Sequence, residues 1–261
     1  MVYYIVVLGT AGSGKTHLTS TFQGWLEDFG FAVATVNLDP AAEWLPYKPD
    51  VDVREYVNAR EVMEKYNLGP NGALIASADL LVTKLNEIYD EVSALRANYV
   101  VIDTPGQLEV FAFRESGPLI LNTLTSDGKT VVLFLIDAVF SMRASGFLSA
   151  LLLASSINVR LGKSQVNVLT KIDLIEKERV EKLIEYMENY DELITDLLSE
   201  RQVRILWSTS DLEAILPRLT AYELIPVSSI TREGFDNLYA IIQRIVAGGE
   251  DYYTEEPSPI L

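Results

Sequence analysis

The sequence has no cysteine and only one histidine among its 261 residues. The absence of cysteine excludes disulfide bonds, thiolate metal sites and cysteine nucleophiles. Basic residues are also few, since 21 Lys and Arg stand against 37 Asp and Glu, for a net charge of −16. Such a chain lacks the broad basic surface that binds nucleic acids or anionic membranes. We therefore expect no direct nucleic-acid partner and no membrane partner.

Long apolar runs are missing as well. The longest, at 131–136 and 147–155, are too short to span a bilayer, and residues 1–4 lack the basic start of a signal peptide. We therefore expect a cytoplasmic protein. Apolar residues make up 49% and charged residues 22% of the chain, which is typical of a globular protein large enough for one α/β domain.

The strongest motif lies at residues 9–16, which fit the pattern G-x-x-x-x-G-K-[ST]. An apolar run at 2–8 precedes it and a helical pattern at 17–29 follows it, as a phosphate-binding loop requires. Glycines let successive backbone N–H groups point inward, and the helix adds its positive dipole end. The residues expected to bind phosphate are Gly12, Ser13, Gly14, Lys15 and Thr16. Lys15 would reach the β- and γ-phosphates and Thr16 would ligate Mg²⁺.

Apolar runs alternate with helical patterns along the rest of the chain. The predicted strands are 2–8, 32–36, 99–102, 129–136, 165–169 and 224–227. This alternation predicts an α/β fold with a doubly wound, mainly parallel sheet between two helical layers. We expect one domain over 1–247, with helical insertions at 41–98 and 174–223, and an acidic, mobile tail at 248–261.

Three segments between the strands are interpreted further. A helix running to Tyr66 precedes the turn-forming sequence Asn67–Gly72, and a second helix is expected over 79–95. A long charged helical stretch follows the fifth strand, at 176–201. The stretch 146–157 is apolar nearly all round, so it is either a buried helix or a surface for a subunit or client protein.

Acidic residues follow two of the predicted strands. Asp39 comes after the second strand, on the side where open α/β sheets bind ligands, although an Asp before Pro is also common in plain turns. Asp103 ends the third strand and begins the sequence Asp-Thr-Pro-Gly-Gln. An acid there can hold Mg²⁺, and the N–H of Gly106 can approach the γ-phosphate. Gln107 follows directly.

Two further motifs indicate which base is bound. Thr170-Lys171-Ile172-Asp173 follows the fifth strand, and Ser228 follows the sixth. Guanine presents two donors along one edge, and a carboxylate at Asp173 can accept both, whereas a buried Asp173 would stay unpaired beside adenine. The stem of Lys171 can lie over the purine face. A backbone N–H near Ser228 could donate to the guanine carbonyl.

Four of these motifs follow the strands in a fixed order: residues 9–16, Asp103-Thr104-Pro105-Gly106, Thr170-Lys171-Ile172-Asp173 and Ser228-Ser229. In this order they resemble the G1, G3, G4 and G5 motifs of GTPases. With Gly69-Pro70-Asn71 and Asn37-Leu38-Asp39-Pro40-Ala41 added, nearly the whole chain resembles a GPN-loop GTPase of the archaeal type. Thr170 replaces the Asn that is usual in most GTPases. The resemblance implies a homodimer in which the GPN loop of one subunit enters the nucleotide site of the other, so that Asn71 acts in trans. Eukaryotic relatives are linked to RNA polymerase II assembly, which implies a possible client protein.

The expected reaction is hydrolysis of GTP to GDP and phosphate, with Mg²⁺ as cofactor. The expected catalytic residues are Lys15, Asp39, Gln107 and Asn71, and the expected Mg²⁺ ligands are Thr16, Asp39 and Asp103. Further nucleotide contacts are expected at His17, Gly69, Pro70, Gly106, Thr170, Lys171, Asp173 and Ser228. His17 itself is better explained by packing on the first helix. As alternatives, GTP could control a chaperone that binds a client through the apolar helix, or the protein could be an ATP-using kinase or ATPase, which leaves Asp173 unexplained.

Overall fold

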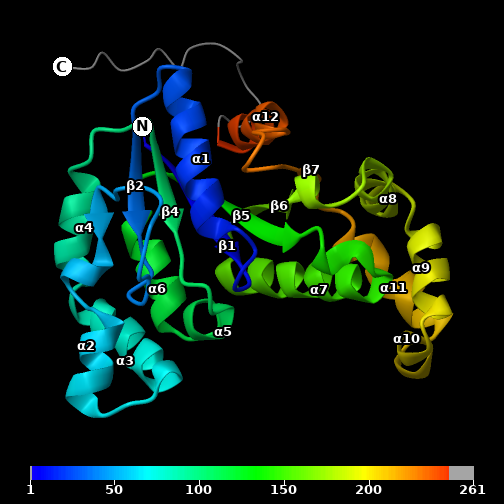
Figure 1. Ribbon diagram of the computed structural model, residues 1–261, viewed down its shortest axis with the longest axis horizontal. Coiled ribbons are helices and arrows are strands. Elements are labelled where there is room, and N and C mark those ends of the chain that lie inside the picture. Colours follow the sequence, from blue (N-terminus) through cyan, green and yellow to red (C-terminus); the bar gives the residue numbers. More distant parts are fainter. Residues whose placement is uncertain (1, 247–261) are drawn as a thin grey trace.

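A sheet of seven parallel strands forms the centre of the molecule (Figure 1). The computed structural model describes residues 2–246, except for the side chains of residues 109 and 110. The strand order is β3-β2-β4-β1-β5-β6-β7. The strands are β1 (Tyr3–Gly9), β2 (Val33–Asn37), β3 (Val51–Asp52), β4 (Tyr99–Asp103), β5 (Lys129–Asp137), β6 (Ser164–Thr170) and β7 (Leu224–Pro226).

Helices cover both faces of the sheet, so the predicted doubly wound parallel fold is confirmed. The α-helices are α1 (Lys15–Asp28), α2 (Ala59–Tyr66), α3 (Pro70–Thr83), α4 (Leu85–Ser93), α5 (Leu108–Phe111), α6 (Ser116–Leu124), α7 (Ala144–Leu161), α8 (Lys177–Glu188), α9 (Tyr190–Ser199), α10 (Arg201–Leu206), α11 (Thr209–Leu219) and α12 (Phe235–Val246). Short 3-10 helices are η1 (Val53–Glu55), η2 (Phe140–Met142) and η3 (Ile172–Leu174). Helices α1 and α12 pack on one face, and α4, α6 and α7 pack on the other.

Strand β1 shows why several strands appear in the sequence as unbroken apolar runs. Tyr4, Val6 and Leu8 point into the hydrophobic core beneath α4, α6 and α7. Ile5 and Val7 point into the core beneath α1 and α12. Successive side chains of a strand face opposite sides, and a sheet covered on both sides needs apolar residues at every position. The edge strand β3 has only two residues, too few for such a pattern, and was not predicted.

The segment around Gly69 differs from the prediction. Asn67 adopts a left-handed conformation, with φ of 50°, and ends α2, while Gly69 is the N-cap of α3 and Pro70 occupies its first turn. Asn71 and Gly72 are therefore helical, and the expectation that they form a turn is wrong. Proline at the first helical position needs no N–H and already has the helical φ angle, so it starts this helix. The helix expected over 79–95 is in fact the C-terminal part of α3 followed by α4.

The two predicted insertions contain most of the remaining elements. Segment 41–98 holds β3, η1, α2, α3 and α4, so it is not wholly helical. In segment 174–223 the charged stretch is divided into α8, α9 and α10, with breaks at Asn189 and Glu200. The tail predicted at 248–261 lies outside the described residues.

Helix α7 is the apolar stretch for which two interpretations were open. In the described part of the chain it is the one helix long and apolar enough to cross a membrane, judged by length and composition. Its side chains Phe147, Leu151 and Ile157 are buried in the core against the sheet, while Ser149 and Ser156 are exposed. A core helix passes the same test of length and composition. One face of α7 is buried as predicted, while 33% of the helix is buried in total and Val159 on its other side is exposed.

Candidate functional site

The loop between β1 and α1 has the geometry of an anion-binding turn. Gly12 and Gly14 adopt positive φ angles of 78° and 96°, which glycine tolerates without strain. Gly14 is also the N-cap of α1, so the free N–H groups of the first turn face the loop. The side chain of Lys15 is buried beneath the loop, where its Nζ donates to the carbonyl oxygens of Gly9 at 3.1 Å and Thr10 at 3.0 Å.

Two carboxylates lie near the ammonium group of Lys15. Burial lowers the pKa of Lys15, and the charges of Asp103 and Asp39 oppose that effect. Burial raises the pKa of Asp103 to about 6, whereas the hydroxyls of Thr16 and Tyr47 and the charge of Lys15 favour its ionised form. Burial also raises the pKa of Asp39, against hydrogen bonds from the backbone of Ala41 and Gly106 and the charges of Lys15 and Arg54. The ends of β2 and β4 therefore converge on the phosphate-binding loop, as predicted.

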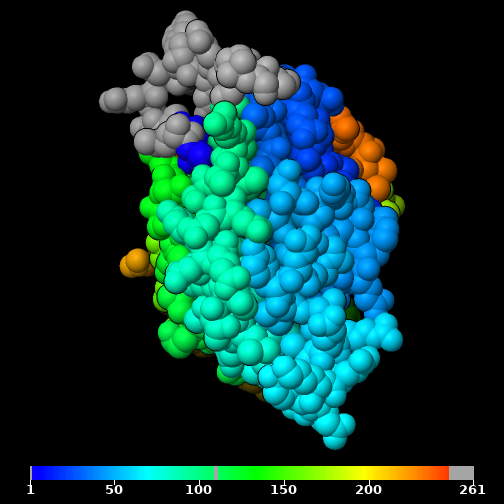
Figure 2. All heavy atoms as spheres, turned by 90° about the vertical axis from the view of Figure 1, so that its left-hand side faces the viewer, coloured from blue at the N-terminus to red at the C-terminus, as the bar shows by residue number. Residues whose placement is uncertain are grey.

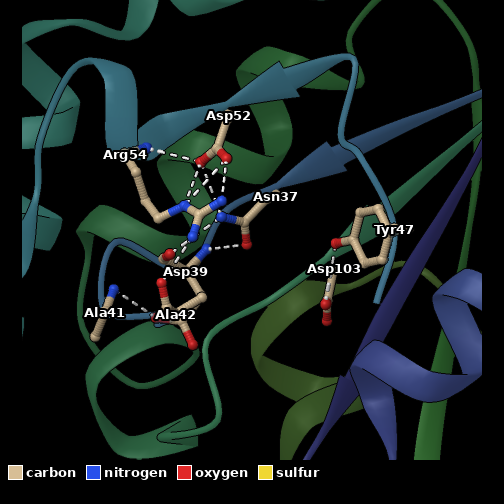
Figure 3. A network of polar contacts seen from close by, with 8 residues as sticks. All are labelled: Asn37, Asp39, Ala41, Ala42, Tyr47, Asp52, Arg54 and Asp103. Carbon is tan, nitrogen blue, oxygen red and sulfur yellow. Dashed lines mark hydrogen bonds and ion pairs between the residues drawn. The ribbon is translucent and has the colours of Figure 1, made fainter. Parts of the chain in front are cut away.

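Asp103 has one satisfied and one unsatisfied carboxylate oxygen. The hydroxyl of Tyr47 donates to Oδ2 at 3.1 Å (Figure 3). Oδ1 is buried and accepts no hydrogen bond of ordinary geometry. An unpaired buried carboxylate oxygen is costly unless a cation or donor approaches it. Tyr47 lies in an irregular loop with no periodic pattern, and nothing in its local sequence indicates this contact.

A cavity of about 250 Å³ adjoins this group. Asp39, Gly106 and Gln107 line one part of it, and the rest of its wall is mostly apolar. The apolar lining residues are Ala11, Leu38, Pro40, Ala41, Leu74, Ala78, Leu81, Pro105, Phe111 and Ile120. Two of the expected catalytic residues, Asp39 and Gln107, therefore line the same space.

A second pocket, of about 500 Å³, lies on the other side of the loop. It is lined by Gly12, Gly14, Lys15, Thr16, His17, Thr170, Lys171, Asp173, Leu174, Ser229 and Ile230. The Thr170 hydroxyl donates to the carbonyl of Ser13 at 2.8 Å, so β6 is fixed to the phosphate-binding loop. Lys171 has a positive φ of 62°, and its Nζ forms an ion pair of 2.6 Å with Asp137 at the end of β5.

Asp173 lies at this pocket, but it is exposed and not buried as the sequence argument assumed. The hydroxyl of Ser228 donates to Asp173 Oδ1 at 2.6 Å. Ser228 is itself fully buried, and its N–H donates to the carbonyl of Glu233 at 3.1 Å. Ser228 thus holds Asp173, while its neighbour Ser229 lines the pocket.

Two further polar side chains near the site are exposed. His17, which is part of α1, lies at the rim of the second pocket, so the expectation that it is a packing residue on the first helix is wrong. Arg114 forms an ion pair with Asp79 at 3.2 Å in which both side chains are exposed. Such an ion pair contributes little to stability, and Arg114 lines neither pocket.

The predicted loop at Gly69, Pro70 and Asn71 lines neither pocket of its own chain, although Leu74, in the next turn of α3, lines the first. All three residues are exposed. In Figure 1 the junction of α2 and α3 lies below the carboxyl ends of the strands, and in Figure 2 this cyan part of the chain protrudes at the lower end of the molecule. Within one subunit, the structure does not bring Asn71 to the phosphate-binding loop.

The site also includes polar residues whose contacts with one another the sequence did not indicate. Asn37, Asp52 and Arg54 form a hydrogen-bonded network beside Asp39 (Figure 3). Asp52 lies fifteen positions from Asn37, and the two meet because β2 pairs with the short strand β3. A contact that depends on strand pairing leaves no signal in the local sequence.

Known proteins with similar sequences and structures were compared with this chain, and the relatives reported below share one family name. A family model described as "Conserved hypothetical ATP binding protein" matches residues 7–248. The chain is 36% identical to the GPN-loop GTPase PAB0955 of Pyrococcus abyssi over 90% of this chain and 93% of that protein. It is 32% identical to GPN-loop GTPase 1 of Dictyostelium discoideum, covering 95% of this chain and 62% of that relative.

A solved structure supports the same assignment. The crystal structure described as a GTPase in apo form, PAB0955 from Pyrococcus abyssi, matches with a TM-score of 0.82 and 35% identity. The match covers 93% of this chain and 97% of that one. The sequence identity, the coverage and the shared fold agree with the motifs that converge on the two pockets. The chain therefore belongs to the GPN-loop GTPase family.

Proposed function

We propose that this protein binds GTP in the second pocket and hydrolyses it to GDP and phosphate. The observation that carries the proposal is the position of the phosphate-binding loop between two groups of residues. Asp173 and Lys171 lie on one side of the loop, and Asp39, Asp103 and Gln107 lie on the other. A nucleotide with its phosphates on the loop would place its base at the first group and its terminal phosphate at the second.

The choice of guanine over adenine rests on Asp173. The family model is described as ATP-binding, whereas the relatives are named GTPases. Guanine has two N–H donors on one edge, and a carboxylate at Asp173 would accept both, while Ser228 already holds the carboxylate in place. Adenine offers no matching pair of donors. The chemistry of the pocket therefore favours GTP, in agreement with the names of the relatives, over ATP.

The residues around Asp103 fit a magnesium ion. The unpaired, buried Oδ1 of Asp103 and the nearby hydroxyl of Thr16 are oxygen donors of the kind that Mg²⁺ prefers. Asp39 is a further candidate, since it is the other carboxylate beside Lys15. When bound, Mg²⁺ would neutralise charge on the phosphates. The ammonium group of Lys15 would stabilise the same charge from beneath the loop.

The remaining step is to orient water toward the terminal phosphate. Catalysis of phosphoryl transfer depends mainly on positioning and on electrostatic stabilisation. Asp39 and Gln107 both line the cavity beside Gly106, whose backbone N–H can approach the γ-phosphate. We assign the water to Asp39 because its carboxylate can accept a proton, and we regard Gln107 as the rival residue.

The first prediction is a preference for GTP. Purified protein with Mg²⁺ should hydrolyse GTP at least about tenfold more efficiently than ATP, because the base contacts of Asp173 require a guanine. Phosphate release under steady-state conditions measures both rates. Equal use of the two nucleotides, or a preference for ATP, would overturn the proposed base specificity, and absence of hydrolysis would overturn the proposed reaction.

We further propose that the working form is a homodimer in which Asn71 acts on the partner's phosphates. Asn71 is exposed, lies in the first turn of α3 and lines neither pocket of its own subunit. The site described above contains no arginine suited to transition-state charge among the residues lining the two pockets. A donor from a second subunit would complete it. The cytoplasmic location and the client protein stay predictions.

Mixing two inactive variants tests whether Asn71 acts in trans. Lys15→Ala removes the phosphate contact but keeps Asn71, and Asn71→Ala does the opposite. Each variant alone should lose about 100-fold in turnover, as when a donor to transition-state charge is removed. An equal mixture should recover about a quarter of the wild-type rate, because half the dimers are mixed and each has one complete site.

The mixture distinguishes this proposal from a role within one subunit. If Asn71 acts in its own subunit or only supports the fold, the mixture will show no more than the average of the two variants. Asn86→Ala serves as the control, because Asn86 is an exposed asparagine on α4 in the same insertion. Its turnover should equal that of the wild type.

A further inference from the structure

The loop that carries Asp39 is held by an ion pair outside the proposed catalytic residues. Asp52 ends the edge strand β3, and Arg54 lies two residues later in η1. We propose that Asp52 and Arg54 are positioning residues that hold Asp39 in the site. This inference rests on the proposed function, since it concerns the orientation of a residue assigned to GTP hydrolysis.

The carboxylate of Asp52 is the centre of the network (Figure 3). It accepts hydrogen bonds from Arg54 Nε at 3.0 Å, from Arg54 Nη2 at 2.6 Å and from the backbone N–H of Arg54 at 3.0 Å. It also accepts one from the side-chain amide of Asn37 at 3.0 Å. Burial disfavours its charge, but the Arg54 donors outweigh that effect and hold the pKa of Asp52 below its usual value.

The network reaches Asp39 along two routes. Asn37 is fully buried at the end of β2; its Oδ1 accepts from the N–H of Asp39 at 3.0 Å, and its Nδ2 donates to the carbonyl of Asp39 at 3.2 Å. Arg54 Nη1 donates to the carbonyl of Ala42 at 2.8 Å. Both routes start at Asp52 and hold the backbone of the loop, one at Asp39 itself and the other at Ala42.

Backbone contacts also hold this part of the chain, since the N–H of Leu38 donates to the carbonyl of Asp103 at 2.8 Å. Strand β3 pairs with β2 at only two positions, Val36 with Val51 and Asn37 with Asp52. The N–H of Ala59, at the start of α2, donates to the carbonyl of Pro40 at 2.9 Å. The Asp39 carboxylate itself accepts a hydrogen bond from the N–H of Ala41 at 2.9 Å. The Asp52 network therefore acts on the carboxylate by fixing the backbone on which it is carried, at Asp39 and at Ala42.

An ordinary surface ion pair would not have this effect. The pair between Arg60 and Glu64 on α2 has side chains that are 83% and 67% exposed, whereas those of Arg54 and Asp52 are 26% and 11% exposed. Shielding from water strengthens charge-assisted hydrogen bonds, and the planar guanidinium group uses several donors in fixed directions. Lysine could replace the charge of Arg54 but not this set of directions.

The test compares Arg54→Met with wild type, alone and in an Asp39→Asn background. Methionine keeps the apolar stem and removes the donors. The single variant should lower kcat by about 10- to 100-fold, since a small displacement of a catalytic group reduces the rate to that extent. The affinity for a non-hydrolysable GTP analogue should change by less than about threefold. In the Asp39→Asn background the same substitution should change kcat by less than about twofold.

Matched controls separate positioning from folding. Arg60→Met removes the exposed pair on α2 and should leave kcat and the midpoint of thermal unfolding unchanged. Compared with Arg54→Met, Arg54→Lys should bring the midpoint of thermal unfolding closer to the wild-type value than it brings kcat. An unchanged kcat for Arg54→Met, or an equal loss with and without Asp39, would overturn the inference while GTP turnover by the wild type still supports the proposed function. Absence of turnover in the wild type itself would overturn the proposed function.

Discussion

Replacing Asp173 by asparagine is expected to weaken GTP binding by about 100-fold. The substitution removes two charge-assisted hydrogen bonds to guanine, each worth about 1.5–3 kcal/mol when shielded from water. Asp173 is exposed in this structure, so solvent screens part of that energy and we take about 3 kcal/mol in total, which is a factor of about 100 in affinity. The amide of asparagine would also direct an N–H donor at the donors of guanine.

Comparison of three nucleotides makes this test specific. Binding of ATP should change little, because adenine does not use the Asp173 carboxylate. Xanthosine triphosphate should bind the variant better than the wild type, since its base carries a second carbonyl where guanine has an amino group, and the new amide can donate to it. Titration with fluorescent analogues measures all three affinities. Asp90→Asn, on an exposed acid of α4, is the control and should leave them unchanged.

Loss of ATP and GTP binding together would contradict the assignment of Asp173 to the base. Such a result would mean that the carboxylate supports the pocket through Ser228 instead. Retention of full GTP affinity would mean that the base lies elsewhere, and that Thr170-Lys171-Ile172-Asp173 only ends β6. Because Thr170 still ties β6 to the loop through Ser13, the pocket would remain even then.

The sheet could be predicted from the sequence because both of its faces are buried. Strands β1, β4 and β5 are therefore apolar at most of their positions, and the alternation with helices then determines the parallel arrangement. Strand β3 could not be found, since two residues carry no pattern and its pairing with β2 spans a loop. The start of α3 was missed because proline was read as a helix breaker, although Pro70 sits where helices accept proline.

The positions of candidate residues could be predicted from the sequence where the ends of strands determine them. The carboxyl ends of parallel strands lie at one edge, so Asp39, Asp103 and Asp173 were expected near the loop, and the structure brings them there. Residues that act through tertiary contacts were not predicted. Tyr47 reaches Asp103 from an irregular loop, and Arg54 reaches the loop of Asp39 through the carbonyl of Ala42. Burial was also misjudged at His17, which is exposed.

Replacing Asp39 by asparagine is expected to lower kcat by about 10²- to 10⁴-fold, the range for loss of a positioned proton acceptor. Asparagine keeps the side-chain oxygen that accepts the N–H of Ala41 at 2.9 Å, so the turn after β2 should persist. GTP affinity should stay within about threefold of the wild type, because Lys15 and Asp173 still bind the phosphates and the base. Single-turnover hydrolysis, with binding measured on the same protein, separates the two effects.

The rival residue provides the decisive comparison. Gln107 lines the same cavity as Asp39 and has a side-chain amide that could orient water without accepting its proton. If Asp39 has the main role, Gln107→Leu should lower kcat by less than about tenfold, and adding it to Asp39→Asn should have little further effect. If Gln107→Leu instead causes the larger loss while Asp39→Asn still turns over GTP, the assignment is wrong. The water would then be oriented from the end of β4, and the Asp52–Arg54 pair would have no catalytic residue to position.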